Sequence, residues 1–311
     1  MKIRRTYQLA QLELLSRPYD LFIASSGYEA RSTHIAKLKP LVYTSAVFGF
    51  VENKGNEVRI NNDAFYERNN YSYQELSISD NITIAQYLAD YISSSDKPEI
   101  FILVDYSSMT RCWYSSIIHF LRTHEGEGKR ISITFAYSRA TFTLPPDNEN
   151  QTYFFEPIPG FSTLSIPNNP TALIVGLGYE KRRAFGLKEF FDAEETYAFF
   201  TDEDSASEFY PVILDKNKEL LSQIEDNYKF EYPINDLLYT KKLLSDISSS
   251  LNKDYRVLIT PCGPKPFTLI SLLVAIEHRN IDVWRISGEK GFSNSNRVAS
   301  GEILSITVEC E

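Results

Sequence analysis

One short pattern occurs twice in this chain and constrains its fold more than any other feature. Each copy is a run of apolar residues followed by Gly-Tyr-Glu-x-Arg, the first after Leu21–Ala24 and the second after Ala172–Val175. The glycines of the two copies, Gly27 and Gly178, lie 151 positions apart. A short apolar run that ends near a glycine and precedes an amphipathic stretch is typical of a buried strand that turns into a helix. The pattern therefore predicts the opening of a βαβ unit, present twice.

A second pair of segments indicates that the whole chain is duplicated. Ile100–Val104 is continuously apolar, as parallel strands covered on both faces are, and Asp105-Tyr-Ser-Ser-Met-Thr-Arg111 follows it. Arg256–Thr260 is the corresponding strand, and it is followed by Pro-Cys-Gly-Pro-Lys-Pro. Asp105 and Thr260 are 155 positions apart, close to the spacing of the first pair. A period of about 150 residues is one whole domain. We expect an α/β protein of two tandem Rossmann-like units with mainly parallel sheets, related by a pseudo-twofold axis.

The predicted boundaries follow from the pattern and from the prolines. The first unit is expected to span residues 1–150 and to begin with a lead-in helix, because leucines at positions 9, 12 and 15 have helical spacing. Residues 144–170 hold six of the 14 prolines, so 151–170 is interpreted as the connection, with one short strand at Tyr153–Phe155. The second unit is expected to span 171–311 and to end with a strand at Glu302–Val308.

Within the first unit, Ile84, Leu88 and Ile92 recur at helical spacing and predict a helix that precedes the strand at Ile100–Val104.

Composition restricts the classes of function. A net charge of -9 argues against broad coating of nucleic acid, which needs a positive face, but it leaves room for a local basic pocket. The longest uncharged apolar stretch, Pro266–Ile276, is too short to cross a bilayer, which needs about 20 residues, and no signal-peptide pattern is present. We therefore expect a cytoplasmic protein that does not associate with membranes.

Neither a disulfide framework nor a metal site is indicated by the sequence. The three cysteines, Cys112, Cys262 and Cys310, are widely spaced, and the four histidines have no metal-ligand spacing. No metal is expected, and no cofactor is identified.

In an open parallel sheet, ligands bind beyond the carboxyl ends of the strands, where backbone amides and helix N-termini point outward. The distinctive loops of both halves are expected there, gathered around one cleft. Hydroxyls, small residues and a cation after a buried strand suit a phosphate or a ribose. The candidate ligand-binding residues are Ser25, Ser26, Gly27, Tyr28, Arg31, Ser107, Ser108 and Thr110 in the first half, and Gly178, Tyr179, Glu180, Arg182, Cys262, Gly263 and Lys265 in the second.

Neither half has the full G-x-G-x-x-G fingerprint or a Walker sequence. This disfavours both NAD binding in the usual manner and ATP hydrolysis of the P-loop type.

Several candidates also have a purely structural interpretation. Glu29 and Glu180 in a first helical turn would be stabilised by the helix dipole by about 0.3–1 kcal/mol, although capping needs neither the Tyr nor the Arg of the repeated pattern. Asp105 suits a helix cap or a residue that holds the turn as well as a general base, and Arg111, like Lys265, suits the surface as well as a phosphate. The thiol of residue 262 is either activated by a nearby helix start or buried and inert. The acidic segment 202–204 suits a solvated turn or a metal.

The segment Val257-Leu-Ile-Thr-Pro-Cys-Gly-Pro-Lys-Pro-Phe267 resembles the CRISPR-associated Rossmann fold domains that sense cyclic oligoadenylates. Those domains place a Gly-x-Lys-Pro-like loop between a buried strand and a helix. Leu173–Tyr179 and Phe200–Ser205 match their opening strand and second strand, so the likeness covers roughly residues 171–287 and more faintly 19–137. Pro261 and Pro264 depart from the Thr-Gly-Gly-Thr-Lys run that is usual in that family. In the first half, Asp105-Tyr-Ser-Ser-Met-Thr-Arg111 stands in place of the whole run.

Three hypotheses about function follow. The first is a nucleotide-binding sensor or accessory protein of a bacterial antiviral defence system, whose partners are a nucleotide or another phosphorylated small molecule and a further defence protein. The alternative is a hydrolase or glycosyl-transfer enzyme that acts on a nucleotide or a nucleic-acid end. In that enzyme Glu29 or Asp105 would be nucleophile or base, and Arg111 would stabilise developing charge. A third possibility is an interaction subunit in which the repeated loops are purely structural.

Overall fold

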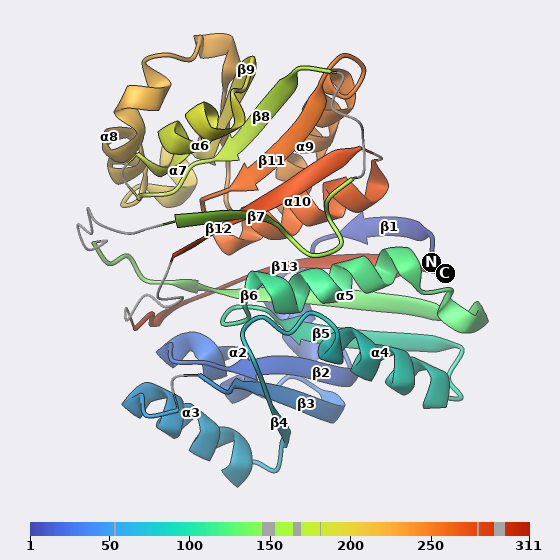
Figure 1. Ribbon diagram of the computed structural model, residues 1–311. Helices are drawn as coiled ribbons and strands as arrows, with labels where there is room; N and C mark the ends of the chain where they lie inside the picture. Colours follow the sequence, from blue (N-terminus) through green and yellow to red (C-terminus); the bar gives the residue numbers. More distant parts are fainter. Residues whose placement is uncertain (53, 145–152, 164–168, 181, 279, 289–295) are drawn as a thin grey trace. The chain divides into compact units, whose positions relative to one another are not determined.

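The computed structural model describes residues 1–52, 54–144, 153–163, 169–180, 182–278, 280–288 and 296–311. The chain divides into two compact units (Figure 1), one formed by Met1–Thr141 with Asn294–Glu311 and the other by Phe142–Ser293. Each unit is built on its own sheet of mostly parallel strands, with seven described strands in the first and six in the second. The predicted fold class, α/β with two Rossmann-like units, is confirmed.

The first sheet has a Rossmann-like strand order. Its five parallel strands, in chain order, are β2 (Tyr19–Ser26), β3 (Val42–Phe50), β4 (Ser72–Leu76), β5 (Glu99–Asp105) and β6 (Arg130–Ala140). They are arranged as β6-β5-β2-β3-β4, so the chain runs from β2 outward to β4 and then returns to the other side of β2. β2 is buried throughout, and β5 is buried except for its first residue and the half-buried Phe101, in agreement with their continuous apolar runs.

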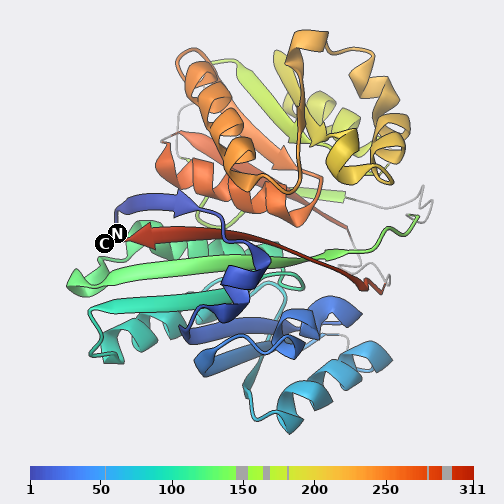
Figure 2. The ribbon, with the colours of Figure 1, turned by 180° about the vertical axis from the view of Figure 1, so that it is seen from behind.

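Helices cover both faces of this sheet (Figures 1 and 2). The 3-10 helix η1 (Ala30–Thr33) leads into α2 (His34–Lys37), and α2 and α3 (Glu57–Arg68) pack with Phe22 and Ala24 of β2. On the opposite face α4 (Thr83–Ser94) and α5 (Arg111–Thr123) contact β3, where Phe48 meets Tyr87 and Phe50 stacks on Trp113. The predicted helix over Ile84–Ile92 is confirmed as α4, with its three apolar residues fully buried. Short α1 (Gln11–Ser16) and η2 (Gly126–Gly128) complete the unit.

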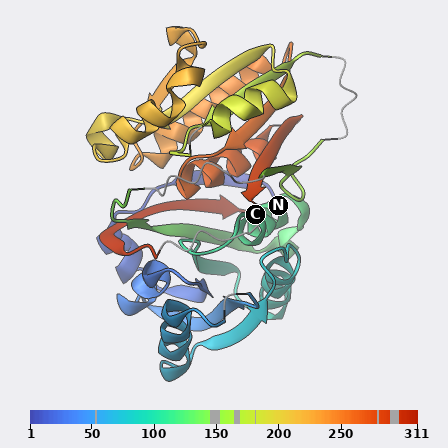
Figure 3. The ribbon, with the colours of Figure 1, turned by 60° about the vertical axis from the view of Figure 1, so that its left-hand side comes forward.

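The second sheet repeats the same strand order. Its parallel strands are β8 (Thr171–Gly176), β9 (Glu195–Thr201), β10 (Lys229–Tyr232), β11 (Arg256–Pro261) and β12 (Ile281–Gly288), arranged as β10-β9-β8-β11-β12. The connections are α6 (Arg183–Phe191), α7 (Glu203–Ala206), α8 (Tyr210–Leu221), η3 (Asp226–Tyr228), α9 (Leu237–Leu251) and α10 (Lys265–Glu277), seen around the sheet in Figure 3. An identical order of five strands in both units agrees with the duplication inferred from the sequence.

The C-terminal strand lies in a different unit from the one that the sequence suggests. β13 (Ala299–Cys310) pairs antiparallel with β6 and with β1 (Ile3–Tyr7), so it belongs to the first sheet, and the boundary drawn at 171–311 differs here. The pairing with β6 extends over most of β13, which gives the strand more backbone partners than a free edge would. The pairing of β13 with β1 brings the N- and C-termini together (Figures 1 and 2), where Lys2 N donates to Glu311 O at 2.8 Å.

Two further local differences concern the ends of the predicted units. The lead-in region forms β1 before the short helix α1, so only its later part is helical. In the predicted connection, residues 151–152 and 164–168 lie outside the described residues, and the predicted strand is β7 (Tyr153–Pro157), which pairs antiparallel with β12.

Two further observations concern membrane-spanning helices and the cysteines. In the described ranges, no helix combines the length and the apolar character needed to cross a membrane. All three cysteines are buried free thiols, so none of them forms a disulfide bond in this structure.

Candidate functional site

The two distinctive loops of the first unit lie side by side at the carboxyl ends of adjacent strands. β2 pairs directly with β5, and the loops that hold Gly27 and Asp105 follow them. A Cβ atom added at Gly27 would lie 3.1 Å from Cβ of Ser108, so the loops are in contact. β2 and β5 are also the strands from which the chain proceeds to opposite halves of the sheet. This topological switch point is where ligands bind in open α/β sheets.

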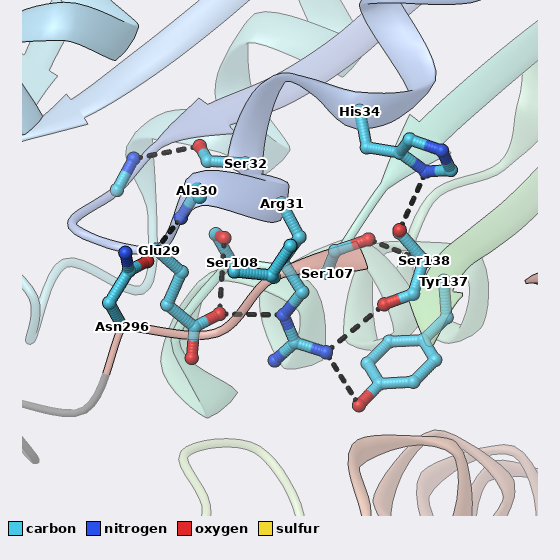
Figure 4. A network of polar contacts seen from close by, with 12 residues as sticks. Glu29, Ala30, Arg31, Ser32, His34, Ser107, Ser108, Tyr137, Ser138 and Asn296 are labelled. Carbon is cyan, nitrogen blue, oxygen red and sulfur yellow. Dashed lines mark hydrogen bonds and ion pairs between the residues drawn. The ribbon is translucent and has the colours of Figure 1, made fainter. Parts of the chain in front are cut away.

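Glu29 and Arg31 form a buried ion pair at this point (Figure 4). Arg31 Nε donates to Glu29 Oε2 at 2.8 Å, and the exposed fractions of the two side chains are 5% and 14%. Arg31 Nη1 donates to the Tyr137 hydroxyl at 2.8 Å and to the Ser138 carbonyl at 3.1 Å, and its guanidinium lies 5.0 Å from the Tyr137 ring centroid. Burial alone would lower the pKa of Arg31, but Tyr137 and Glu29 outweigh it, so the pKa is raised and the side chain stays charged.

Asp105 is held in a buried polar chain that fixes the second loop. Its Oδ1 accepts from the backbone N of Ser107 at 3.0 Å and from the Ser107 hydroxyl at 2.5 Å. The Ser107 hydroxyl in turn accepts from the backbone N of Ser138 at 2.7 Å. Ser138 Oγ lies 2.7 Å from Nδ1 of His34, whose pKa is lowered by burial and by Lys37. The loop after β5 is thus tied to β6 and α2 through side chains.

The remaining first-half candidates have defined positions. Ser26 Oγ donates to Asp63 Oδ1 at 2.5 Å, while Ser25 Oγ is buried and has no hydrogen-bond partner among the described residues. Burial, aided by Glu29, raises the pKa of Tyr28 to about 12, so its hydroxyl stays protonated. Ser108 Oγ reaches Glu29 Oε2 at 3.4 Å.

Thr110 and Arg111 begin the helix that follows the second loop. Thr110 is the N-cap of α5 and accepts from Trp113 N at 3.2 Å, and Arg111 is the first residue of that helix. The structural interpretation of Asp105 allowed a helix cap or a residue that holds the turn. The cap is Thr110, and Asp105 holds the turn through Ser107.

Three backbone N–H groups of the first loop are already bonded within the first unit. Gly27 N donates to Ser32 Oγ at 2.9 Å, Ala30 N to Asn296 Oδ1 at 2.8 Å and Arg31 N to Arg297 O at 3.0 Å. Figure 4 shows Asn296 beside Ala30 and Glu29. The segment just before β13 therefore supplies the acceptors for two of these three N–H groups.

One pair of site residues was missed from the sequence. Asn62 of α3 donates from Nδ2 to the carbonyls of Gly27 and Glu29 at 2.9 and 3.0 Å. Asn217 of α8 donates in the same way to the carbonyl of Gly178 at 2.7 Å. Both are buried, and they lie 155 positions apart, the offset that relates Asp105 to Thr260. A search for identical residues at that offset would have found them.

The corresponding point of the second unit is closed by backbone contacts. A Cβ atom at Gly178 would lie 2.3 Å from the carbonyl oxygen of Cys262, and one at Gly263 would lie 2.6 Å from that of Leu177. Cys262 N also donates to Gly176 O at 2.8 Å. These glycines allow the close approach of two loops, which meet here backbone to backbone, whereas the nearest atom to an added Cβ at Gly27 belongs to a side chain.

The repeated Glu-Arg pair is conserved between the units with a shift of one residue. Glu180 Oε1 pairs at 2.8 Å with Arg183, whose side chain is 14% exposed. Arg182, which the repeated pattern selects, has a positive φ of 60°, is largely exposed and pairs with Glu219 at 2.9 Å. The local left-handed turn at Arg182 moves the next arginine into the position equivalent to Arg31.

The other second-half candidates lie near the same loops. The Tyr179 ring is stacked near Phe209 with centroids 6.5 Å apart, Cys262 is buried, and Lys265 is the first residue of α10. Asp202 caps α7 by accepting from Ser205 N at 2.9 Å, which agrees with a turn at the acidic segment. No cluster of three or more potential metal ligands occurs within the described ranges.

Two comparisons with known proteins give no family for this chain. No protein-family model matches it, and no curated protein matches it either.

Proposed function

We propose that this protein binds a nucleotide or a related phosphorylated small molecule at the carboxyl ends of β2 and β5. The observation that supports the proposal is that two loops rich in polar residues meet at the topological switch point of the first sheet. The second unit repeats the arrangement with closed loops, so we assign the ligand to the first unit.

Arg111 is the cation that we assign to the phosphate. It lies at the first position of α5, where the helix N-terminus and the guanidinium favour the same anion. Arg31 is less suited to that role, because Glu29 balances its charge.

The resemblance to CRISPR-associated Rossmann fold domains extends this proposal to a cytoplasmic sensor or accessory protein of an antiviral defence system that acts with a partner protein. A cyclic oligoadenylate is the ligand that the resemblance implies, and the departures at Pro261 and Pro264 make linear nucleotides equally worth testing.

The experiment is isothermal titration of the full chain with nucleoside mono-, di- and triphosphates and with cyclic oligoadenylates. At least one ligand is expected to bind, and Arg111→Gln is expected to weaken it about tenfold or more, since a charge-assisted hydrogen bond is lost. Arg122→Gln, an exposed change in the last turn of the same helix, is the matched control. Absence of binding across the panel would refute the proposal.

A second candidate is an enzyme that acts on a nucleotide, and one observation favours it. In the part of the chain that the structure describes, the buried polar chain of Asp105, Ser107 and Ser138 lies in the first unit. In the second unit Thr260 takes the place of the aspartate. Loss of turnover in a folded Asp105→Asn variant that still binds ligand would support the enzyme. Unchanged turnover would remove it.

A further inference from the structure

The Glu29–Arg31 pair carries one donor and one acceptor that have no hydrogen-bond partner among the described residues. Nε and Nη1 of Arg31 are bonded, and Oε2 of Glu29 accepts from Arg31 and Ser108. Among the residues that the structure describes, neither Nη2 of Arg31 nor Oε1 of Glu29 has a hydrogen-bond partner. Figure 4 shows both atoms on the same side of the pair, directed away from Ser138 and Ser108.

This edge is held rigidly. Arg31 is 5% exposed and is fixed at Nε, at Nη1 and over one face by the ring of Tyr137. Its backbone N donates to Arg297 O, and the adjacent Ala30 N donates to Asn296. A planar guanidinium with this many restraints loses little freedom when it binds a ligand, so its free edge is preorganised.

The charge of the pair determines which group it can bind. A phosphate would gain little from Arg31, because the carboxylate of Glu29 lies 2.8 Å from its Nε. A neutral planar group with one N–H beside one acceptor atom matches both unused positions, since the N–H can donate to the carboxylate and the acceptor can receive from the guanidinium. Such a donor–acceptor edge is what each nucleobase presents.

We propose that the Glu29–Arg31 pair recognises the edge of a nucleobase, with Oε1 of Glu29 accepting from an amino or imino N–H and Nη2 of Arg31 donating to the neighbouring ring nitrogen or carbonyl. This rests on the proposed function and deepens it, because it separates the base contact from the phosphate contact at Arg111.

The test compares the four ribonucleoside monophosphates with analogues methylated on that edge: N6,N6-dimethyl-AMP, 1-methyl-GMP, N3-methyl-UMP and N4,N4-dimethyl-CMP. Ribose 5-phosphate measures the contribution of sugar and phosphate alone. For the tightest-binding base, methylation is expected to weaken binding about tenfold or more, because a hydrogen bond to a charged group is lost and its partner is left buried. The affinity of ribose 5-phosphate is expected to be the same for wild type and Glu29→Gln.

Glu29→Gln tests the same contact from the protein side, with Glu67→Gln, an exposed change on α3, as the control. In a folded Glu29→Gln variant the penalty of methylation is expected to shrink to less than about threefold. If that variant does not fold, the analogue series with wild-type protein still decides the matter. Equal affinity for parent and methylated nucleotides would overturn the inference while leaving nucleotide binding in place. No binding of any nucleotide would overturn both.

Discussion

Replacing Gly178 by alanine tests whether the loops of the second unit meet backbone to backbone. The added Cβ would lie 2.3 Å from the Cys262 carbonyl oxygen, about 1 Å closer than van der Waals contact allows, and a backbone atom cannot rotate away. One loop must shift, which also strains the Cys262 N to Gly176 O hydrogen bond of 2.8 Å. Overpacking costs about 1–3 kcal/mol and a weakened hydrogen bond about 1 kcal/mol, so we expect a loss of about 2–4 kcal/mol.

Two other glycine variants serve as matched controls. At Gly27 the nearest atom is 3.1 Å away, on the side chain of Ser108, so alanine there should cost less than about 1 kcal/mol. At Gly186, inside α6, nothing lies within 4 Å of an added Cβ, so alanine should stabilise by about 0.5–1 kcal/mol through helix propensity.

The assay is urea unfolding followed by circular dichroism, with the free energy of unfolding compared among the three variants. The expected order of stability is Gly186→Ala, wild type, Gly27→Ala and then Gly178→Ala. A Gly178→Ala protein as stable as wild type would refute the close packing of these loops, and with it the assignment of the ligand to the first unit.

The remaining predictions concern the first unit. Asn62→Ala should lower the free energy of unfolding in urea by about 1–3 kcal/mol and speed amide exchange in residues 28–30, because two buried carbonyls lose their donor. The exposed control Asn61→Ala should change neither quantity. Equal effects of the two substitutions would contradict the role of Asn62. Because burial and Lys37 lower the pKa of His34, the unfolded chain takes up a proton at a higher pH than the folded chain does. The free energy of unfolding should therefore fall as the pH drops below about 6.5, and it should fall less steeply in His34→Gln. A wild-type stability that does not change over this pH range would contradict the prediction. His119, with a pKa lowered by burial and by Arg122, should contribute the same way. Asn296→Ala should speed exchange at the Ala30 amide but not at Arg31, whose partner is a backbone carbonyl; protection unchanged at both amides would count against the Asn296 contact.

The sequence was informative where local pattern and burial coincide. The continuous apolar runs at Leu21–Ala24 and Ile100–Val104 predicted buried parallel strands. Both form parallel strands, the first fully buried and the second buried except for the half-buried Phe101. The repeated Gly-Tyr-Glu and the 155-residue offset predicted the duplication, which agrees with the shared strand order.

The sequence did not predict the features that depend on the pairing of distant strands or on a single backbone dihedral angle. Nothing local to Ala299–Cys310 shows that this strand pairs with β6 of the other unit, because either sheet could accept an apolar strand. The ion pair of the second unit uses Arg183 instead of Arg182, since a positive φ at Arg182 shifts the start of the helix. Spacing alone could not show that Gly178 and Gly263 serve loop contact.

The most direct test of the central claim is hydrogen–deuterium exchange of the full chain, read by mass spectrometry with and without the tightest-binding nucleotide of the titration panel. The account predicts added protection in residues 27–32 and 105–111, at the carboxyl ends of β2 and β5, with less change in the closed loops around Gly178 and Gly263. Protection confined to the second unit, or to segments outside both of these loops, would contradict it.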